Sequence, residues 1–246
     1  MGRKEWKGKN WKDERLEGGV GRMGKTAAFF DVDGTIVNTT IVHYYARFRL
    51  RLLLPVLRPF WLIGFIPKVV YYLFLDKASR TKFNQVFYRN YRGMDAERVK
   101  QLARETFDTA FRPKIFPPAI EKIAEHQKRA DLVVLVTGSL DFIIQPLADY
   151  LKTDHILAVQ LYEDSGKFTG ELTTLPLGGE EKARVVKTFA EQHDIELASS
   201  YAYGDSRADL PMLQCVGNPV VVNPGKALRQ TATELNWEIQ EWKPDS

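Results

Sequence analysis

Short apolar runs alternate with helical patterns along most of the chain. The apolar runs, each followed by a polar turn, cover residues 26–32, 131–139, 199–206 and 219–223. Apolar positions recur at helical spacing between and after these runs, in residues 117–129, 180–193 and 225–235. Strands that alternate with helices predict βαβ units, so we expect an α/β fold with a doubly wound, Rossmann-like parallel sheet. Residues 156–162 and 167–172 flank a turn and predict an antiparallel hairpin at the sheet edge.

Residues 41–115 interrupt this alternation and are helical in character. Within them, residues 98–111 carry one stripe at helical spacing, formed by Val99, Leu102, Ala103, Thr106 and Phe107. The prolines at positions 55, 59 and 67 argue against a long regular helix across residues 52–75. We therefore expect a helical cap over residues 41–115, inserted into a catalytic core formed by residues 26–40 and 116–240.

Charge is distributed unevenly over these parts. The net charge of +4 combines +10 in residues 41–115, with 15 basic and 5 acidic residues, −8 in residues 116–246, with 12 basic and 20 acidic residues, and +2 in residues 1–40. Residues 1–25 mix charges with glycines, lack the apolar stretch of a signal peptide, and predict a mobile basic tail. No recognised nucleic-acid-binding motif accompanies the basic residues, so we expect no nucleic-acid partner. The single cysteine, Cys215, excludes an internal disulfide framework and fits a reducing, cytoplasmic compartment.

Reactive side chains follow the predicted strands, at the edge where open α/β sheets place their sites. They are Asp31 and Asp33 after the first strand, Thr137 and Gly138 after the second, Asp205 and Asp209 after the third, and Lys182 at the start of a helix. Four carboxylates in one cleft require a compensating cation, and oxygen-only ligands indicate a hard ion such as Mg²⁺. With a lysine and a hydroxyl nearby, such a set suits a phosphoryl group.

In this order, these residues resemble the motifs of the haloacid dehalogenase superfamily, with DVDGT at 31–35, VTGS at 136–139, Lys182, and GDSRAD at 204–209. The insertion after the first motif resembles the capped group, subfamily IB, that includes the phosphoserine phosphatases. The resemblance implies a Mg²⁺-dependent phosphomonoester hydrolase. The implied roles are aspartyl-phosphate formation by Asp31, acid–base catalysis by Asp33, phosphate binding by Thr137, Gly138 and Lys182, Mg²⁺ ligation by Asp31, Asp33 and Asp205, and support of the metal or of Lys182 by Asp209.

The inserted cap is the part expected to select the substrate. Phosphoserine phosphatases carry a glutamate soon after the first motif, whereas residues 38–40 here read Asn-Thr-Thr. Arg80 and Arg89 are the candidates for the arginine that their cap supplies. The inserted cap is rich in arginine and leucine and is interrupted by prolines. In this composition it is similar to the insert of bacterial phosphatidylglycerophosphate phosphatases. We therefore expect a phospholipid headgroup phosphate as substrate, and a peripheral contact of residues 41–75 with the inner face of the membrane.

Two other interpretations are open at this point. The protein is alternatively a soluble phosphatase for a small metabolite, such as phosphoserine or a polyol phosphate, with the apolar cap residues buried as the seams of a helical bundle. It is alternatively a catalytically silent binding module, although the complete motif set argues against that. His43 and Asn223 are weaker candidates for the cleft, and Cys215 is expected to pack in the core.

Overall fold

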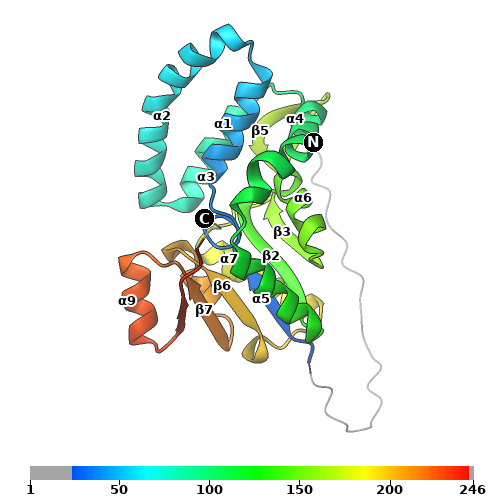
Figure 1. Ribbon diagram of the computed structural model, residues 1–246, viewed down its shortest axis with the longest axis vertical. Coiled ribbons are helices and arrows are strands. Elements are labelled where there is room, and N and C mark those ends of the chain that lie inside the picture. Colours follow the sequence, from blue (N-terminus) through cyan, green and yellow to red (C-terminus); the bar gives the residue numbers. More distant parts are fainter. Residues whose placement is uncertain (1–23, 244–246) are drawn as a thin grey trace, which may run out of the picture.

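The structure is a computed structural model and describes residues 24–243 (Figure 1). Residues 1–23 of the predicted basic tail lie outside this range. Within it, six parallel strands form one sheet in the order β3-β2-β1-β6-β7-β8. The strands are β1 (Ala27–Phe30), β2 (Leu132–Leu140), β3 (His155–Val159), β6 (Tyr201–Gly204), β7 (Asn218–Val222) and β8 (Glu238–Gln240). The predicted parallel, doubly wound α/β fold is confirmed.

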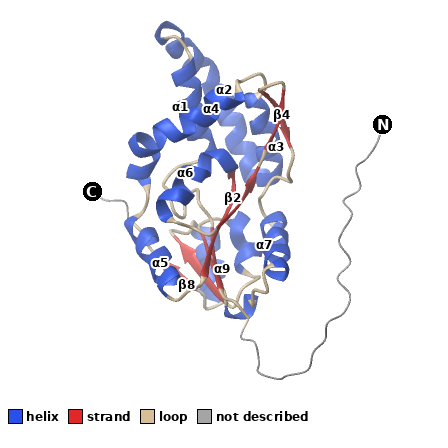
Figure 2. Cartoon of the chain, turned by 90° about the vertical axis from the view of Figure 1, so that its right-hand side faces the viewer, coloured by secondary structure: helices blue, strands red, loops and turns tan. Residues whose placement is uncertain are grey.

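Helices cover both faces of the sheet, which explains why its strands are apolar throughout. They are α5 (Pro117–Lys128), α6 (Asp141–Leu151), α7 (Glu180–Gln192), α8 (Leu210–Leu213) and α9 (Lys226–Glu234). In β1, Phe30 packs in the core beneath α5 and α6, whereas Phe29 packs in the core beneath α7, α8 and α9. Figure 2 shows α5 and α7 on opposite sides of the strands. The two layers bury β1 completely at the centre of the molecule.

The predicted hairpin begins later in the chain than expected. Residues 155–159 pair in parallel with β2 and form β3 of the main sheet, so the extension of the hairpin back to residue 156 was wrong. The hairpin consists of β4 (Leu161–Asp164) and β5 (Lys167–Leu172), which form a separate antiparallel sheet. The apolar run that precedes it covers the edge of β2, whose backbone groups would otherwise be unpaired.

Residues 41–114 are helical almost throughout. The elements are α1 (Ile41–Leu52), α2 (Arg58–Ala78), α3 (Arg80–Tyr88) and α4 (Ala96–Thr106), with short turns at Pro55–Leu57, Arg89–Tyr91, Phe107–Phe111 and Arg112–Lys114. All five residues of the predicted stripe in 98–111 are buried. The β4–β5 hairpin joins these helices through backbone bonds between Phe168 and both Gly93 and Met94. We call residues 41–115 the cap segment, and its boundaries stay a prediction.

The apolar stretch of the cap segment forms one long helix, contrary to the expectation from its prolines. Helix α2 runs for 21 residues and contains Pro67. Pro59 lies in its first turn, where no N–H donor is needed, and Pro55 belongs to a separate short turn. Only Pro67 removes an interior hydrogen bond, and the helix curves but continues (Figure 1). Taken together, the short turn at Pro55–Leu57 and α2 form the helical stretch Pro55–Ala78, which is the one stretch among the described residues that is long and apolar enough to span a membrane by length and composition.

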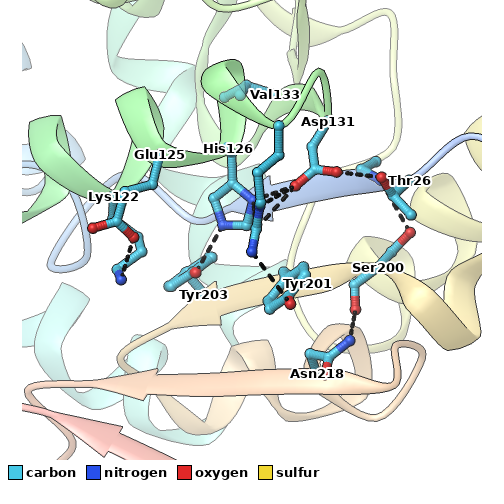
Figure 3. Close-up of polar contacts among 12 residues, drawn as sticks. Thr26, Lys122, Glu125, His126, Asp131, Val133, Ser200, Tyr201, Tyr203 and Asn218 are labelled. Carbon is cyan, nitrogen blue, oxygen red and sulfur yellow. Dashed lines mark hydrogen bonds and ion pairs between the residues drawn. The ribbon is translucent and has the colours of Figure 1, made fainter.

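A buried polar network holds α5 against the sheet (Figure 3). The ring nitrogens of His126 lie 2.8 Å from Oδ2 of Asp131 and 2.8 Å from the hydroxyl of Tyr203. The guanidinium of Arg129 lies 2.9 Å from Asp131, and the hydroxyl of Thr26 donates to the same carboxylate. Because buried polar groups need partners, this network stabilises the position of α5 against β6.

Candidate active site

The structure brings the seven predicted site residues to the carboxyl end of the central strands. Asp31 and Asp33 follow β1, Thr137 and Gly138 lie in the second half of β2, and Asp205 follows β6. Lys182 and Asp209 reach the same place from α7 and from the turn before α8. A pocket at this edge is lined by Asp31, Asp33, Gly138, Lys182 and Asp209, together with residues of the cap segment.

Lys182 lies at the centre of a buried ion-pair cluster. Its ammonium donates to Oδ1 of Asp31 and, at 2.6 Å, to Oδ1 of Asp209, and all three side chains are buried. Burial lowers the pKa of Lys182, but the charges of Asp209 and Asp31 outweigh that effect and hold it above its ordinary value. The ammonium therefore stays charged and fixes one oxygen of Asp31.

The cluster carries more negative charge than Lys182 neutralises. Carboxylate oxygens of Asp31, Asp205 and Asp209 lie within 4.8 Å of one another. Burial and the charge of Asp209 raise the pKa of Asp31 to about 7, against the opposing effect of Lys182. Burial, Asp31 and Asp209 likewise raise the pKa of Asp205. A divalent cation relieves such repulsion, and a site with only oxygen ligands matches Mg²⁺, so these residues fit that ion.

The turns after β1 and β6 hold these carboxylates in place. Thr35 donates from its hydroxyl to Oδ2 of Asp31 at 3.0 Å. Gly34 has a φ of +99° and passes so close to the Asp205 carboxylate that a side chain at position 34 would collide with it. Ser206 donates to Oδ2 of Asp209 from its hydroxyl at 2.6 Å and from its backbone N–H at 3.0 Å. Local geometry thus explains Gly34 and Thr35 in the first motif, and Ser206 and Asp209 in the last.

Asp33 has a different environment from Asp31. Ser139 donates to its Oδ2 at 2.5 Å, and Thr137 lies 3.4 Å from the same oxygen. Its Oδ1 is buried without a hydrogen-bond partner within residues 24–243. Burial raises the pKa of Asp33, which favours the protonated form of an acid catalyst. Thr137 thus lies behind Asp33, and of the three predicted phosphate-binding residues only Gly138 and Lys182 line the pocket.

The sequence profile of the haloacid dehalogenase-like hydrolases matches residues 28–214, most of the described chain. The protein belongs to this family. It is similar to a probable phosphatase of Mycobacterium tuberculosis, with 30% identity over 90% of this chain and 77% of the relative. It is similar to a phosphoserine phosphatase of the same organism, with 29% identity over 88% of this chain and 71% of that one. A histidinol-phosphatase of Neisseria meningitidis is 27% identical over 89% of this chain and its own full length.

Two solved structures have the same fold. A phosphoserine phosphatase determined with a phospho-aspartyl intermediate analogue superposes with a TM-score of 0.66, at 20% identity, over 90% of this chain and 95% of that one. A protein of unknown function from Bordetella pertussis superposes with a TM-score of 0.75, at 22% identity, over 88% and 98% of the two chains. These likenesses show the fold, whereas the family and the relatives identify the chain as a phosphoric monoester hydrolase of the phosphoserine phosphatase-like kind.

Helix α3 supplies pocket residues that the sequence motifs did not include. Arg80, one of the two arginine candidates, and Asn84 line the pocket one helical turn apart. Asn84 is 1% exposed, and neither atom of its amide has a hydrogen-bond partner among the described residues. Tyr88, one turn further on, donates to the carbonyl of Gly138 at 2.6 Å. The spacing of residues 80, 84 and 88 in the sequence could have indicated this shared face, since residues four apart lie on one side of a helix.

The weaker candidates lie elsewhere. Arg89 borders the β4–β5 hairpin near Gly170, away from the catalytic pocket. His43 contacts the hydroxyl of Thr40 at 3.1 Å at an exposed position, and Asn223 accepts a hydrogen bond from the backbone of Trp242 at 2.7 Å. Cys215 packs against the core, as expected. Thr40 and Ile41 line the pocket where phosphoserine phosphatases were expected to carry a glutamate, so this wall is uncharged.

Proposed function

We propose that this protein hydrolyses phosphate monoesters through an aspartyl-phosphate on Asp31, with Mg²⁺ held by Asp31, Asp205 and the backbone carbonyl of Asp33. The observation that supports this most strongly is the buried cluster in which Lys182 holds Asp31 while Asp205 and Asp209 leave an excess of negative charge. When bound, Mg²⁺ would neutralise the phosphoryl oxygens and part of that excess.

The first half-reaction uses both carboxyl groups after β1. Lys182 and Thr35 orient the carboxylate of Asp31, one oxygen of which forms a bond to phosphorus while the bond from phosphorus to the ester oxygen breaks. Asp33, held by Ser139, donates its proton to the departing ester oxygen. The backbone N–H of Gly138 and the ammonium of Lys182 bind the phosphoryl oxygens in this proposal, and the Thr137 hydroxyl assists by holding the carboxyl group of Asp33.

The second half-reaction returns the enzyme to its starting state. Asp33, now ionised, takes a proton from a water molecule, and the water oxygen forms a bond to phosphorus. The bond between Asp31 and phosphorus breaks, inorganic phosphate leaves, and Asp33 is protonated again. Asp209 supports both steps indirectly, because it shares Lys182 with Asp31 and is itself fixed by Ser206.

For the substrate, we propose a phospholipid headgroup phosphate such as phosphatidylglycerophosphate. The cap segment carries a charge of +10, which suits an anionic substrate or surface. Thr40 stands where a glutamate would recognise the ammonium group of phosphoserine, and the pocket instead presents Arg80 and Asn84. In this proposal the protein works in the cytoplasm, at the inner face of the membrane, with residues 41–75 as the peripheral contact.

The second candidate is a soluble phosphatase for a small metabolite, such as a phosphoserine-like compound or a polyol phosphate. The names of the relatives support this candidate, since they include a phosphoserine phosphatase and a histidinol-phosphatase. The small size of the pocket also supports it, because a volume of about 50 Å³ suits a phosphoryl group better than a bulky ester. Membership of the haloacid dehalogenase-like hydrolases, together with relatives named as phosphatases, argues against a silent binding module.

A paired substrate panel tests the proposal. Detergent-dispersed phosphatidylglycerophosphate and phosphatidic acid are compared with phosphoserine, histidinol phosphate, glycerol 3-phosphate and p-nitrophenyl phosphate, each with Mg²⁺ and with EDTA. We expect Mg²⁺-dependent turnover with the highest kcat/KM on a lipid phosphate. Inert lipid phosphates with rapid turnover of a small ester would establish the second candidate, and turnover unaffected by EDTA would contradict the metal site.

A further inference from the structure

Helix α2 is apolar on all sides but is packed on only one. Its inner side carries Phe65 and Tyr72, which are buried and contact the rings of Tyr45 and Phe87. Its outer side exposes a row of large apolar residues: Phe60, Ile63, Ile66, Val70, Leu73 and Phe74. Phe60 and Phe74 are each 72% exposed. A helix on a protein surface normally turns polar residues to water, so the outer face of α2 is suited to a less polar contact.

The exposed face is long and continues beyond α2. Leu54 and Val56, in the turn before the helix, are 67% and 68% exposed. A helix of 21 residues extends for roughly 30 Å, and apolar side chains face outward along most of that length. Only 11% of the most apolar window of Pro55–Ala78 is buried, so this helix does not serve as the core of the protein. Contiguous apolar surfaces of this kind mark sites of protein or membrane interaction.

The charges of the cap segment favour one of those two partners. Residues 41–75 contain five Arg or Lys residues and no Asp or Glu. Arg47, Arg51 and Lys68 are exposed. A second copy of this chain would bring the same positive charges together, which opposes self-association through this face. An anionic bilayer supplies both negative headgroups and apolar acyl chains, and it therefore matches the face in charge and in polarity.

We propose that the outer face of α2 is a docking surface for an anionic lipid bilayer, and that α2 lies along the bilayer interface. This inference rests on the proposed function only for the choice of substrate, since the docking follows from surface chemistry alone. A spanning orientation would pull Phe65 and Tyr72 away from Tyr45 and Phe87 and would place Lys68 in the hydrocarbon region. Docking along the interface keeps the inner side packed.

The carboxyl end of α2 leads to the catalytic pocket. Asp76, in its last turn, forms an ion pair at 3.0 Å with Arg80, which lines the pocket. A wide open groove bordered by residues 76–81, 178–181 and 206–208 adjoins that pocket and shares four lining residues with it: Arg80, Gly178, Ser206 and Ala208. A headgroup phosphate at the interface beside α2 thus has a polar path to the site.

Vesicle co-sedimentation tests the docking. The full-length protein is mixed with vesicles of equal parts phosphatidylglycerol and phosphatidylcholine, or of phosphatidylcholine alone. The test variant combines Ile63→Ser, Ile66→Ser and Phe74→Ser. The matched control combines Tyr162→Ser, Leu175→Ser and Leu235→Ser, which replace three exposed apolar residues outside the cap segment. We expect wild type and control to bind the anionic vesicles, and the test variant to partition at least roughly tenfold less.

A fluorescent probe gives a second readout that does not depend on the loss of a function. An environment-sensitive dye is attached to Ile63→Cys, and separately to Tyr162→Cys, each in a Cys215→Ala background. We expect anionic vesicles to shift the emission of the dye at position 63 to shorter wavelength and to leave the dye at position 162 unchanged. Melting temperature and turnover of p-nitrophenyl phosphate are measured for every variant, since they report folding and catalysis separately from docking.

Several results would overturn the docking proposal. These are an absence of binding to anionic vesicles, equal binding by the test variant, or an unshifted dye at position 63. Sedimentation velocity that shows a wild-type dimer converted to a monomer by the α2 substitutions, without vesicle binding, would assign the face to self-association instead. Failure of docking with normal phosphatase activity would leave the catalytic proposal intact, and docking by an inactive enzyme would contradict the catalytic proposal alone.

Discussion

At the residue scale, the distribution of charge around Lys182 governs the site. One ammonium lies between Asp31 and Asp209, while Asp205 is near both carboxylates and has no ion-pair partner of its own among the described residues. Without a bound cation, the cluster therefore has an excess of negative charge. This excess, together with burial, raises the pKa of Asp205.

Replacement of Asp205 by asparagine tests that imbalance through stability. Without metal, Asp205→Asn removes one repelling carboxylate, and we expect the melting temperature to rise by roughly 2–4 °C. Added Mg²⁺ should stabilise the wild type but not the variant, because the variant lacks a ligand. Thermal unfolding in EDTA and in Mg²⁺ measures both effects, with the exposed Asp164→Asn as the control. Equal stabilisation of both proteins by Mg²⁺ would exclude Asp205 as a ligand.

Asn84 offers a second test of the site. Its amide makes no hydrogen bond among the described residues, so its removal breaks none of them. We expect Asn84→Ala to leave the melting temperature unchanged and to raise KM by roughly tenfold, the effect of losing one or two hydrogen bonds to the substrate. Asn90→Ala is the matched control, since Asn90 donates to Tyr72 and to the carbonyl of Phe87. That variant should melt earlier with an unchanged KM. A destabilised Asn84→Ala protein with normal KM would assign Asn84 a structural role.

The sequence predicted the positions of some of these residues in the site but not of others. Asp31, Asp33 and Asp205 directly follow strands of a parallel sheet, so their convergence follows from topology. Thr137 follows the same rule, yet its hydroxyl lies against Asp33, a detail that depends on side-chain packing. Asn84 is an ordinary residue within a helix, and its contact with the pocket depends on how α3 is placed over β2.

At the scale of elements, α2 shows how position decides the effect of proline. Pro59 costs nothing in the first turn of a helix, and Pro67 alone does not outweigh the packing of Phe65 and Tyr72 on either side of it. The spacing of the prolines therefore misled the prediction for residues 52–75. The prediction of one strand over 156–162 was wrong for a different reason. The local sequence does not show that residues 155–159 pair with the outer edge of β2.

Helix α5 provides a prediction for pH. Burial lowers the pKa of His126, so the histidine is neutral in the folded protein at a pH where the unfolded chain already binds a proton. Stability from this site is fully present above the unfolded pKa near 6.5 and is lost progressively as pH falls below that value through the lowered pKa of the folded state. We expect the unfolding free energy of the wild type to decrease from pH 7.5 to pH 5.5 more than that of His126→Gln.

The same variant should also be less stable at pH 7.5, by roughly 1–3 kcal/mol, because glutamine does not satisfy both Asp131 and Tyr203. Urea unfolding at the two pH values measures both effects, and His193→Gln at the end of α7 serves as the control. The same loss of stability with acid in wild type and His126→Gln would place the sensitive group elsewhere.

At the scale of the whole molecule, opposite charges lie in different parts of the chain. The cap segment carries +10, whereas residues 116–246 carry −8 and supply Lys182, Asp205 and Asp209 of the catalytic cluster. Charge composition predicted this division, but it did not reveal that the apolar residues between the basic ones face outward on α2. The exposure of these apolar residues depends on which side of α2 the other helices of the cap segment cover.

Salt should therefore affect the two kinds of substrate differently. Raising ionic strength from 0.05 M to 0.5 M NaCl screens the attraction between the cap segment and anionic vesicles, and we expect the rate on a phospholipid phosphate in those vesicles to fall severalfold. Turnover of p-nitrophenyl phosphate should change little, since the buried cluster is poorly screened. Equal salt sensitivity of both reactions would show that the cap charge does not guide the substrate.

The most direct test of the account is to identify the phosphorylated residue. The enzyme is mixed with p-nitrophenyl phosphate and Mg²⁺, quenched in acid during turnover, digested and analysed by mass spectrometry. We predict a phosphoryl group on Asp31 that is absent without Mg²⁺ and absent in Asp31→Asn, which should also lose activity by roughly a thousandfold or more. Hydrolysis that continues in Asp31→Asn, or phosphate found on another residue, would contradict the account.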